Sequence, residues 1–166
     1  MELKVSDEKT AAVSAVKKIS ISGIVMALYV TVMFFTQGFA FGQFQIRIAT
    51  ALYGLSAIYP FLILPLGLSN LLSNTIMGGL GPLDMIGGFA AGLITSTAVY
   101  FIKKLQLNDW FIALPIILGP GLLVPIWLSY LLHLPYRVLA ISLVTGQIIP
   151  GIVGVILVKV MRNIKL

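Results

Sequence analysis

The sequence predicts an all-α membrane protein, a bundle of six transmembrane helices with both termini in the cytosol. Of its 166 residues, 59% are hydrophobic and only 10% are charged, whereas a soluble domain carries about 25% charged residues. The apolar residues come in runs long enough to cross a bilayer, which takes about 20 residues per helix. The basic residues lie mainly at the ends of these runs. Lipid is therefore expected to be the solvent for most of the outer surface.

The chain divides into three parts. Residues 1–18 are polar and of mixed charge, and we interpret them as a cytosolic N-terminal tail. The apolar segment that follows is too long for a signal-peptide core and has no small-residue cleavage site before a polar mature domain. A six-helix transmembrane domain is expected over 19–160, followed by a basic cytosolic tail at 161–166.

Breaker residues divide the transmembrane domain. The first span is expected at about 19–36. The apolar stretch from 47 to 72 contains Pro60 and Pro65, so it is interpreted as two short spans that turn near 59–65. The Gly-rich segment 77–82 predicts a loop, and span four follows at 83–102. Span five, 109–132, contains three prolines and is expected to be kinked or broken. Span six is expected at 136–158.

The charge distribution favours six spans. With the N-terminus inside, six crossings place nine of the eleven basic residues in the cytosol: Lys4, Lys9, Lys17, Lys18, Lys103, Lys104, Lys159, Arg162 and Lys165. Only Arg47 and Arg137 then fall outside. Five crossings would put the basic C-terminal cluster outside, against the positive-inside rule. The net charge of +6 is thus explained by helix ends rather than by nucleic-acid binding.

Several functional classes lack their motifs. The chain has no cysteine, and it contains no phosphate loop, zinc-binding motif or nucleophile elbow. We therefore expect no enzyme activity, no catalytic residue, no metal site and no cofactor. An ATP-driven process would need other subunits. The sequence contains no long internal repeat, so it does not indicate an inverted-repeat transporter.

Charged residues inside a membrane domain are functional candidates because their burial in lipid is costly. Asp84 follows the Gly-rich segment and is interpreted either as the N-cap of span four or as a ligand-binding group. Arg47 either contacts a ligand or partner or extends to the headgroups. His133 and Arg137 are interpreted as interfacial. All four are expected at the extracellular end.

Uncharged polar and aromatic residues add to this candidate site. Amides lie in or beside the apolar stretches at Gln43, Gln45, Asn70, Asn74 and Gln147. Each can form an interhelical hydrogen bond, but together with Asp84 they can bind the edge of a planar polar ligand. Aromatic residues that could stack on such a ligand, or belong to an interfacial belt, are Tyr53, Trp127, Tyr130 and Tyr136. On the first span, Gly23 and Ala27 are four residues apart and would let another helix approach closely.

The sequence resembles one known family. Its features are Gln45-Ile46-Arg47-Ile48-Ala49-Thr50-Ala51-Leu52, a Pro-bearing stretch ending in Asn74, then Gly81-Pro82-Leu83-Asp84 and the late Gly146-Gln147. They resemble the queuosine-precursor transporter (QueT) family, substrate-binding S components of energy-coupling factor (ECF) transporters. The resemblance implies a multi-pass protein of a prokaryotic plasma membrane. Its implied partners are a transmembrane coupling subunit and two ATPases, with docking through Gly23 and Ala27 and release of substrate by toppling.

The resemblance also implies a substrate class, the 7-deazaguanines such as queuine or 7-aminomethyl-7-deazaguanine. A guanine-type edge carries adjacent N–H donors that a carboxylate can accept, and Asp84 is the expected acceptor. The other expected substrate-binding residues are Arg47, Gln45, Asn74, Gln147, Tyr53 and Trp127.

Two positions depart from the family pattern, because Thr50 and Gln147 stand where typical members have Glu. If those acids balance a cationic amine, their loss favours a neutral deazapurine or another vitamin-like heterocycle. The alternatives from other classes are a membrane interaction protein without a small ligand and a standalone permease.

Overall fold

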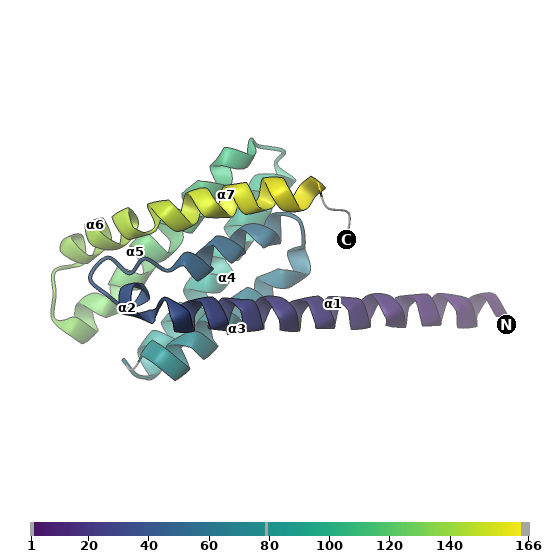
Figure 1. Ribbon diagram of the computed structural model, residues 1–166, viewed down its shortest axis with the longest axis horizontal. Coiled ribbons are helices and arrows are strands. Elements are labelled where there is room, and N and C mark those ends of the chain that lie inside the picture. The colour runs from purple at the N-terminus through teal and green to yellow at the C-terminus, as the bar shows by residue number, and fades with distance from the viewer. Residues whose placement is uncertain (1, 79, 164–166) are drawn as a thin grey trace.

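The computed structural model describes the backbone of residues 2–78 and 80–163, and the side chains of residues 14–78 and 80–163. Within these ranges every regular element is a helix and no strand occurs, which confirms the all-α prediction. The elements, labelled in Figure 1 where there is room, are α1 (Glu2–Phe35), α2 (Gln37–Ala40), η1 (Ile48–Ala57), η2 (Pro60–Leu62), α3 (Ile63–Ser73), η3 (Asn74–Gly78), α4 (Pro82–Lys104), η4 (Asp109–Ile112), α5 (Ala113–Leu132), α6 (Tyr136–Gly146) and α7 (Ile148–Asn163).

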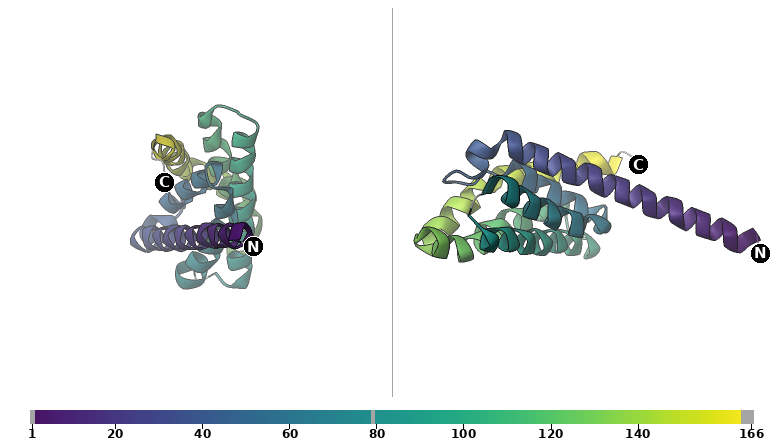
Figure 2. Two further views of the ribbon diagram at one scale, coloured as in Figure 1. Left: turned by 90° about the vertical axis from the view of Figure 1, so that its right-hand side faces the viewer. Right: turned by 90° about the horizontal axis from the view of Figure 1, so that it is seen from below.

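The helices form a bundle in which sequence neighbours mostly pack together. The helix α4 contacts α3 on one side and α5 on the other, whereas α1 packs on α3 and η1, and α7 packs on η1 and α5. Figure 2 shows the same bundle from two further directions, with α1 along one side of it. The backbone of the predicted tail is helical from residue 2 and continues into the first span. The side chains of Lys4, Lys9 and Lys165 lie outside the described residues.

Five described helices are long and apolar enough to cross a membrane, and the predicted second span is shorter. The long ones are Ser14–Phe35, Pro60–Gly78, Pro82–Lys104, Asp109–Leu132 and Tyr136–Asn163, whereas η1 has 10 residues. A 3₁₀-helix rises about 2.0 Å per residue, so η1 reaches about 20 Å. This is less than the hydrocarbon core of about 30 Å. The chain is thus a multi-pass membrane protein, and the count of six spans stays a prediction.

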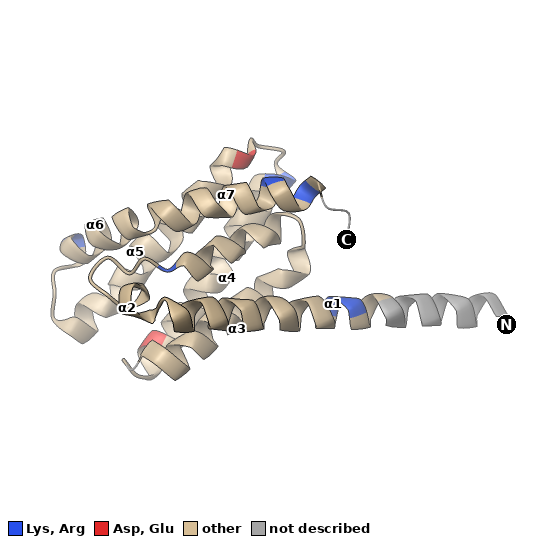
Figure 3. Ribbon diagram, viewed as in Figure 1, with Lys and Arg blue, Asp and Glu red and all other residues tan. Residues whose placement is uncertain are grey.

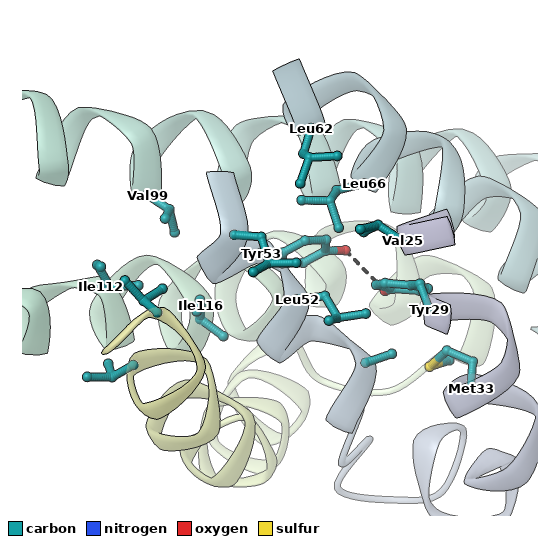
Figure 4. Packing of buried hydrophobic residues seen from close by; sticks show 14 of the residues in the cluster. Val25, Tyr29, Met33, Leu52, Tyr53, Leu62, Leu66, Val99, Ile112 and Ile116 are labelled. Carbon is teal, nitrogen blue, oxygen red and sulfur yellow. Dashed lines mark hydrogen bonds between the residues drawn. The ribbon is translucent and has the colours of Figure 1, made fainter. Parts of the chain in front are cut away.

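The short element η1 lies at the centre of the bundle. Eight of its residues are buried, from Ala49 to Ser56, as expected for an apolar helix that is packed on all sides. Gly54 is needed there, because a Cβ atom on it would lie 2.9 Å from the Gly154 carbonyl oxygen of α7. The core around η1 includes Tyr53, Leu66 and Ile116, all 0% exposed (Figure 4).

Proline accounts for the predicted turn near residue 60, but the prolines of the later spans do not all interrupt their helices. The chain turns at Tyr59, and Pro60 begins the next helical segment, as the two-span interpretation requires. Span five was expected to be kinked or broken; a break is wrong, because α5 is continuous through Pro120 and Pro125, and the kink stays a prediction. Membrane helices tolerate such prolines where the surroundings satisfy the freed backbone groups. The last span is instead divided at Gln147, three residues before Pro150, which cannot donate to the Gly146 carbonyl.

Basic residues gather at one end of the bundle. The ends of α4 and α7 meet there, because Asp109 accepts hydrogen bonds from Lys103 (3.0 Å) and Arg162 (2.6 Å). In Figures 1 and 3 the basic segment of α1 and the end of α7 lie toward this same end. An even number of crossings requires the first and last spans to have their terminal ends at the same end of the bundle, as they do here. The side of the membrane that this end faces stays a prediction.

Candidate binding site

Arg47 lies inside the bundle. The residue is 3% exposed, so the interpretation that it extends to the headgroups is wrong. It precedes η1, and its Nε donates to the Ala40 carbonyl oxygen (3.3 Å). Its Nη1 donates to Oδ1 of both Asn70 (3.2 Å) and Asn74 (3.1 Å). The Phe41 ring covers the guanidinium, with 4.8 Å from Cζ to the ring centroid. Arg47 therefore joins the loop after α2 to the end of α3.

The two asparagines extend this network in opposite directions. Because Arg47 has only donors, both amide oxygens face it and both NH₂ groups point elsewhere. The Asn70 Nδ2 atom donates to Tyr53 Oη (2.9 Å), and the Asn74 Nδ2 atom donates to the Asp84 carbonyl oxygen (3.0 Å). Tyr53 Oη lies 3.2 Å from Tyr29 Oη, and the dashed line in Figure 4 marks this hydrogen bond. The hydrogen bonds thus connect α1, η1, α3 and α4.

Asp84 is buried in the first turn of α4. The N-cap of that helix is Gly81, and no side chain caps it, so the interpretation of Asp84 as the N-cap is wrong. Its Oδ1 instead accepts a hydrogen bond from Trp127 Nε1 of α5 (2.9 Å), and the residue is 2% exposed. A Cβ atom on Gly78 would lie 3.1 Å from the other oxygen, Oδ2. No described donor bonds to Oδ2, which lies beside Gly78.

A second group of polar residues surrounds Gln147, where the last span is divided. Its Nε2 donates to the Gln45 carbonyl oxygen (2.9 Å). Its Oε1 lies 2.7 Å from Thr50 Oγ1, which is also 2.7 Å from the Arg47 carbonyl oxygen. The hydroxyl has one proton and serves one of these acceptors at a time. The two positions that depart from the family pattern therefore contact each other, and this chain has a neutral pair there.

Glycines let the elements approach closely enough to form these contacts. A Cβ atom on Gly88 would lie 2.5 Å from Asn74 Nδ2, and one on Gly87 would lie 2.6 Å from the Trp127 ring. A Cβ atom on Gly146 would overlap the Phe44 carbonyl oxygen. The small residues of α4 and α6 thus fix the position of α3, α5 and the loop before η1 around the site.

A cavity of about 310 Å³ adjoins this network. Small-molecule sites have volumes of about 300–1,000 Å³, so the cavity suits a small compound. The loop before η1 supplies one wall, with Phe41, Gln43, Gln45 and Arg47, and leucines of α5 and α6 supply much of the other. Gly78, next to Asp84, also lines it. The cavity lining therefore combines polar side chains of this loop with apolar leucines.

The seven residues predicted to bind substrate lie in two adjoining hydrogen-bonded groups, one around Arg47 and one around Gln147, which meet at Thr50. Only Gln45 and Arg47 line the cavity, whereas the others are linked behind it: Asp84, Asn74, Gln147, Tyr53 and Trp127. His133 and Arg137 are exposed, as expected of interfacial residues.

Some residues of the site were missed in the prediction. Asn70 was named among the candidate amides but not among the expected substrate-binding residues, although it is four residues before Asn74 and therefore on the same helical face. Phe41 and the leucines of the apolar wall had no usable signal, because apolar residues are common throughout the chain.

Gly23 and Ala27 are exposed on α1, away from the site. The opposite face of the helix packs inward through the buried residues Val25, Tyr29 and Met33. Nothing described lies within 4 Å of a Cβ atom on Gly23. An apolar groove of about 280 Å³ adjoins this part of α1 and is lined by Ile21, Ile24, Val25, Leu55, Tyr59, Leu62 and Met161.

The fold and the site define a multi-pass helical membrane protein with a buried polar network beside a small cavity. The family model for the QueT transporter matches residues 19–163, and the chain therefore belongs to the QueT transporter family. It is a membrane transporter rather than an enzyme. No curated protein and no solved structure is significantly similar to the chain.

Proposed function

We propose that this chain is the substrate-binding S component of an ECF-type importer and captures a queuosine precursor, a 7-deazaguanine. The observation that carries the proposal is the cavity of about 310 Å³ whose polar wall contains the buried Arg47 and Gln45. Membership in the QueT transporter family supports a role in transport, and the cavity has a suitable size for a bicyclic heterocycle.

The polar groups around the cavity fit the edges of such a ring. A 7-deazaguanine has N–H donors beside a carbonyl oxygen. Asp84 does not line the cavity, but its Oδ2 lies beside Gly78, which does, and among the described residues only Oδ1 has a donor, Trp127. A ligand that reaches past Gly78 would place a ring N–H against Oδ2. Gln45 provides an amide on the same wall as Arg47. Gln147, Asn74 and the aromatic residues then hold these groups in position rather than contacting the ligand.

A neutral heterocycle is the second candidate substrate class, and a specific contact favours it. Thr50 and Gln147 lie 2.7 Å apart where typical members of the family carry two acids. A site that lacks both carboxylates stabilises an ammonium group less. The second candidate is therefore a deazapurine, or another vitamin-like heterocycle, without a cationic side chain.

Energy for uptake comes from partner subunits in this proposal. Gly23 and Ala27 leave an exposed small-residue face on α1 beside the apolar groove, which suits close packing of a helix from the transmembrane coupling subunit. Two ATPase subunits complete the importer, in the plasma membrane of a prokaryote. Toppling of the loaded bundle then releases substrate into the cytosol.

Binding of matched compounds to the purified protein tests this proposal. Queuine and 7-aminomethyl-7-deazaguanine should each raise its apparent melting temperature, whereas thiamine, riboflavin and biotin should not. Asp84→Asn should weaken binding by about 1–3 kcal/mol, because a ring N–H loses a charged acceptor. Asp109→Asn, at the other end of the bundle, is the matched control and should bind as the wild type does. A flavin, thiamine or biotin that co-purifies with the protein would contradict the substrate assignment.

A further inference from the structure

The guanidinium of Arg47 has donors that the described protein does not use. An arginine has five N–H groups. In Arg47 the one on Nε has the Ala40 carbonyl as acceptor, and the two on Nη1 have Asn70 and Asn74. Among residues 14–78 and 80–163, nothing accepts from the two N–H groups on Nη2. The residue lines the cavity while being only 3% exposed.

The charge of Arg47 is also unpaired within the described part of the chain. Both ion pairs found there involve Asp109, at the basic end of the bundle. The three acceptors around Arg47 are neutral amide or carbonyl oxygens. A buried cation is normally paired or fully hydrogen-bonded, since removing it from water is costly. The unused donors of Arg47 therefore favour an oxygen acceptor that the described part of the protein does not supply.

The surroundings hold this donor pair in a fixed place. Two asparagine oxygens hold Nη1, a backbone carbonyl holds Nε, and the Phe41 ring covers the plane of the group. The guanidinium is planar and rigid, so fixing Nε and Nη1 also fixes the direction of both Nη2 donors. A ligand oxygen then binds without ordering the side chain, which lowers the cost of binding.

We infer that Arg47 is a specificity-determining residue that binds a carbonyl oxygen of the substrate ring through Nη2 and excludes rings with an amino group at that position. An exocyclic amino group would place its N–H donors against those of Nη2 and leave the two Nη2 donors without an acceptor. Sites that hydrogen-bond one ligand group discriminate strongly against an analogue lacking it. This inference rests on the proposed function and adds to it which edge of the ring faces Arg47.

The test compares 7-deazaguanine with 2,6-diamino-7-deazapurine, in which an amino group replaces the 6-oxo group and N1 loses its proton; the Arg47→Lys variant separates the contribution of the oxo group from that of N1–H. Titration calorimetry on the purified full-length protein measures both. The oxo ring should bind roughly 10- to 100-fold more tightly, the range expected for one buried hydrogen bond to a charged group. Equal binding of both rings would overturn the inference and leave the proposed function standing. If neither ring binds, the proposed function fails and the inference fails with it.

A variant of Arg47 tests whether this residue causes the preference for the oxo ring over the amino ring. Arg47→Lys keeps the positive charge but loses the planar pair of donors, so the preference for the oxo ring should fall by at least about 3-fold. Arg162→Lys is the matched control, because Arg162 pairs with Asp109 at the basic end of the bundle and does not line the cavity. That variant should keep the full preference. Full preference in the Arg47→Lys protein would overturn the inference, and the wild-type comparison stands even if this variant is unstable.

Discussion

Replacing Gly146 by alanine should displace the loop that forms the polar wall of the cavity. The new Cβ atom would overlap the carbonyl oxygen of Phe44, so either this loop or α6 has to move. Forcing a methyl group into a packed site costs about 1–3 kcal/mol. The same movement weakens the hydrogen bond from Gln147 Nε2 to the Gln45 carbonyl (2.9 Å), and the loss of a buried hydrogen bond costs about 1–3 kcal/mol.

The total is about 2–5 kcal/mol, because relaxation is shared between the two effects. For a chain of this size this corresponds to a fall of about 5–15 °C in the apparent melting temperature. The assay is thermal unfolding of the purified protein in detergent, together with binding of 7-deazaguanine. Gly38→Ala is the matched control, because nothing lies within 4 Å of a Cβ atom there. If both variants melt within 1–2 °C of the wild type, a shift of under about 1 kcal/mol, the close approach of α6 to the loop is refuted.

Three further changes test other parts of the structure. Trp127→Phe keeps the ring but removes the donor to Asp84, so it should lower stability by about 1–3 kcal/mol; Trp110→Phe is the control, since Trp110 is 53% exposed, and equal melting temperatures would refute the bond. Asp109→Asn weakens the link between the ends of α4 and α7 and should cost about 1 kcal/mol, because its basic partners are partly exposed; an effect that does not diminish at high salt would contradict the ionic origin. Ala27→Leu should abolish co-purification with the coupling subunit while ligand binding persists, and intact assembly would show that the partner docks elsewhere.

The helical membrane fold followed from composition because few charged residues were present to face water. The position of Asp84 within the site was harder to predict, since a carboxylate in the first turn of a helix usually interacts with the helix terminus. Its partner is Trp127, which lies 43 residues away in the sequence. Such a pairing depends on how α4 and α5 pack, and no local pattern encodes it.

The location of Arg47 was also hard to predict from the sequence. An arginine at the start of an apolar stretch is compatible both with the lipid interface and with the protein interior. Its location in the interior depends on Asn70 and Asn74, whose side-chain oxygens accept hydrogen bonds from its Nη1. The spacing of the two amides places them on one helical face, but the sequence does not say which element that face meets.

Backbone geometry was predicted least well. A run of apolar residues such as 48–57 gives the same hydropathy whether it is an α-helix or the more extended 3₁₀-helix that η1 forms. The prolines were equally ambiguous, since α5 accommodates Pro120 and Pro125 whereas the chain is divided just before Pro150. The outcome depends on whether neighbouring groups satisfy the freed carbonyls, which is a tertiary property.

Native mass spectrometry of the purified protein tests the central claim most directly. The protein would be offered 7-deazaguanine, thiamine and riboflavin at equal concentrations, with the Arg47→Lys variant measured alongside. A substrate-binding subunit of the proposed kind should bind one molecule of 7-deazaguanine per chain, in preference to the other two, and the variant should retain less of it. A wild-type protein that binds none of the three, or that prefers thiamine or riboflavin, would contradict the account.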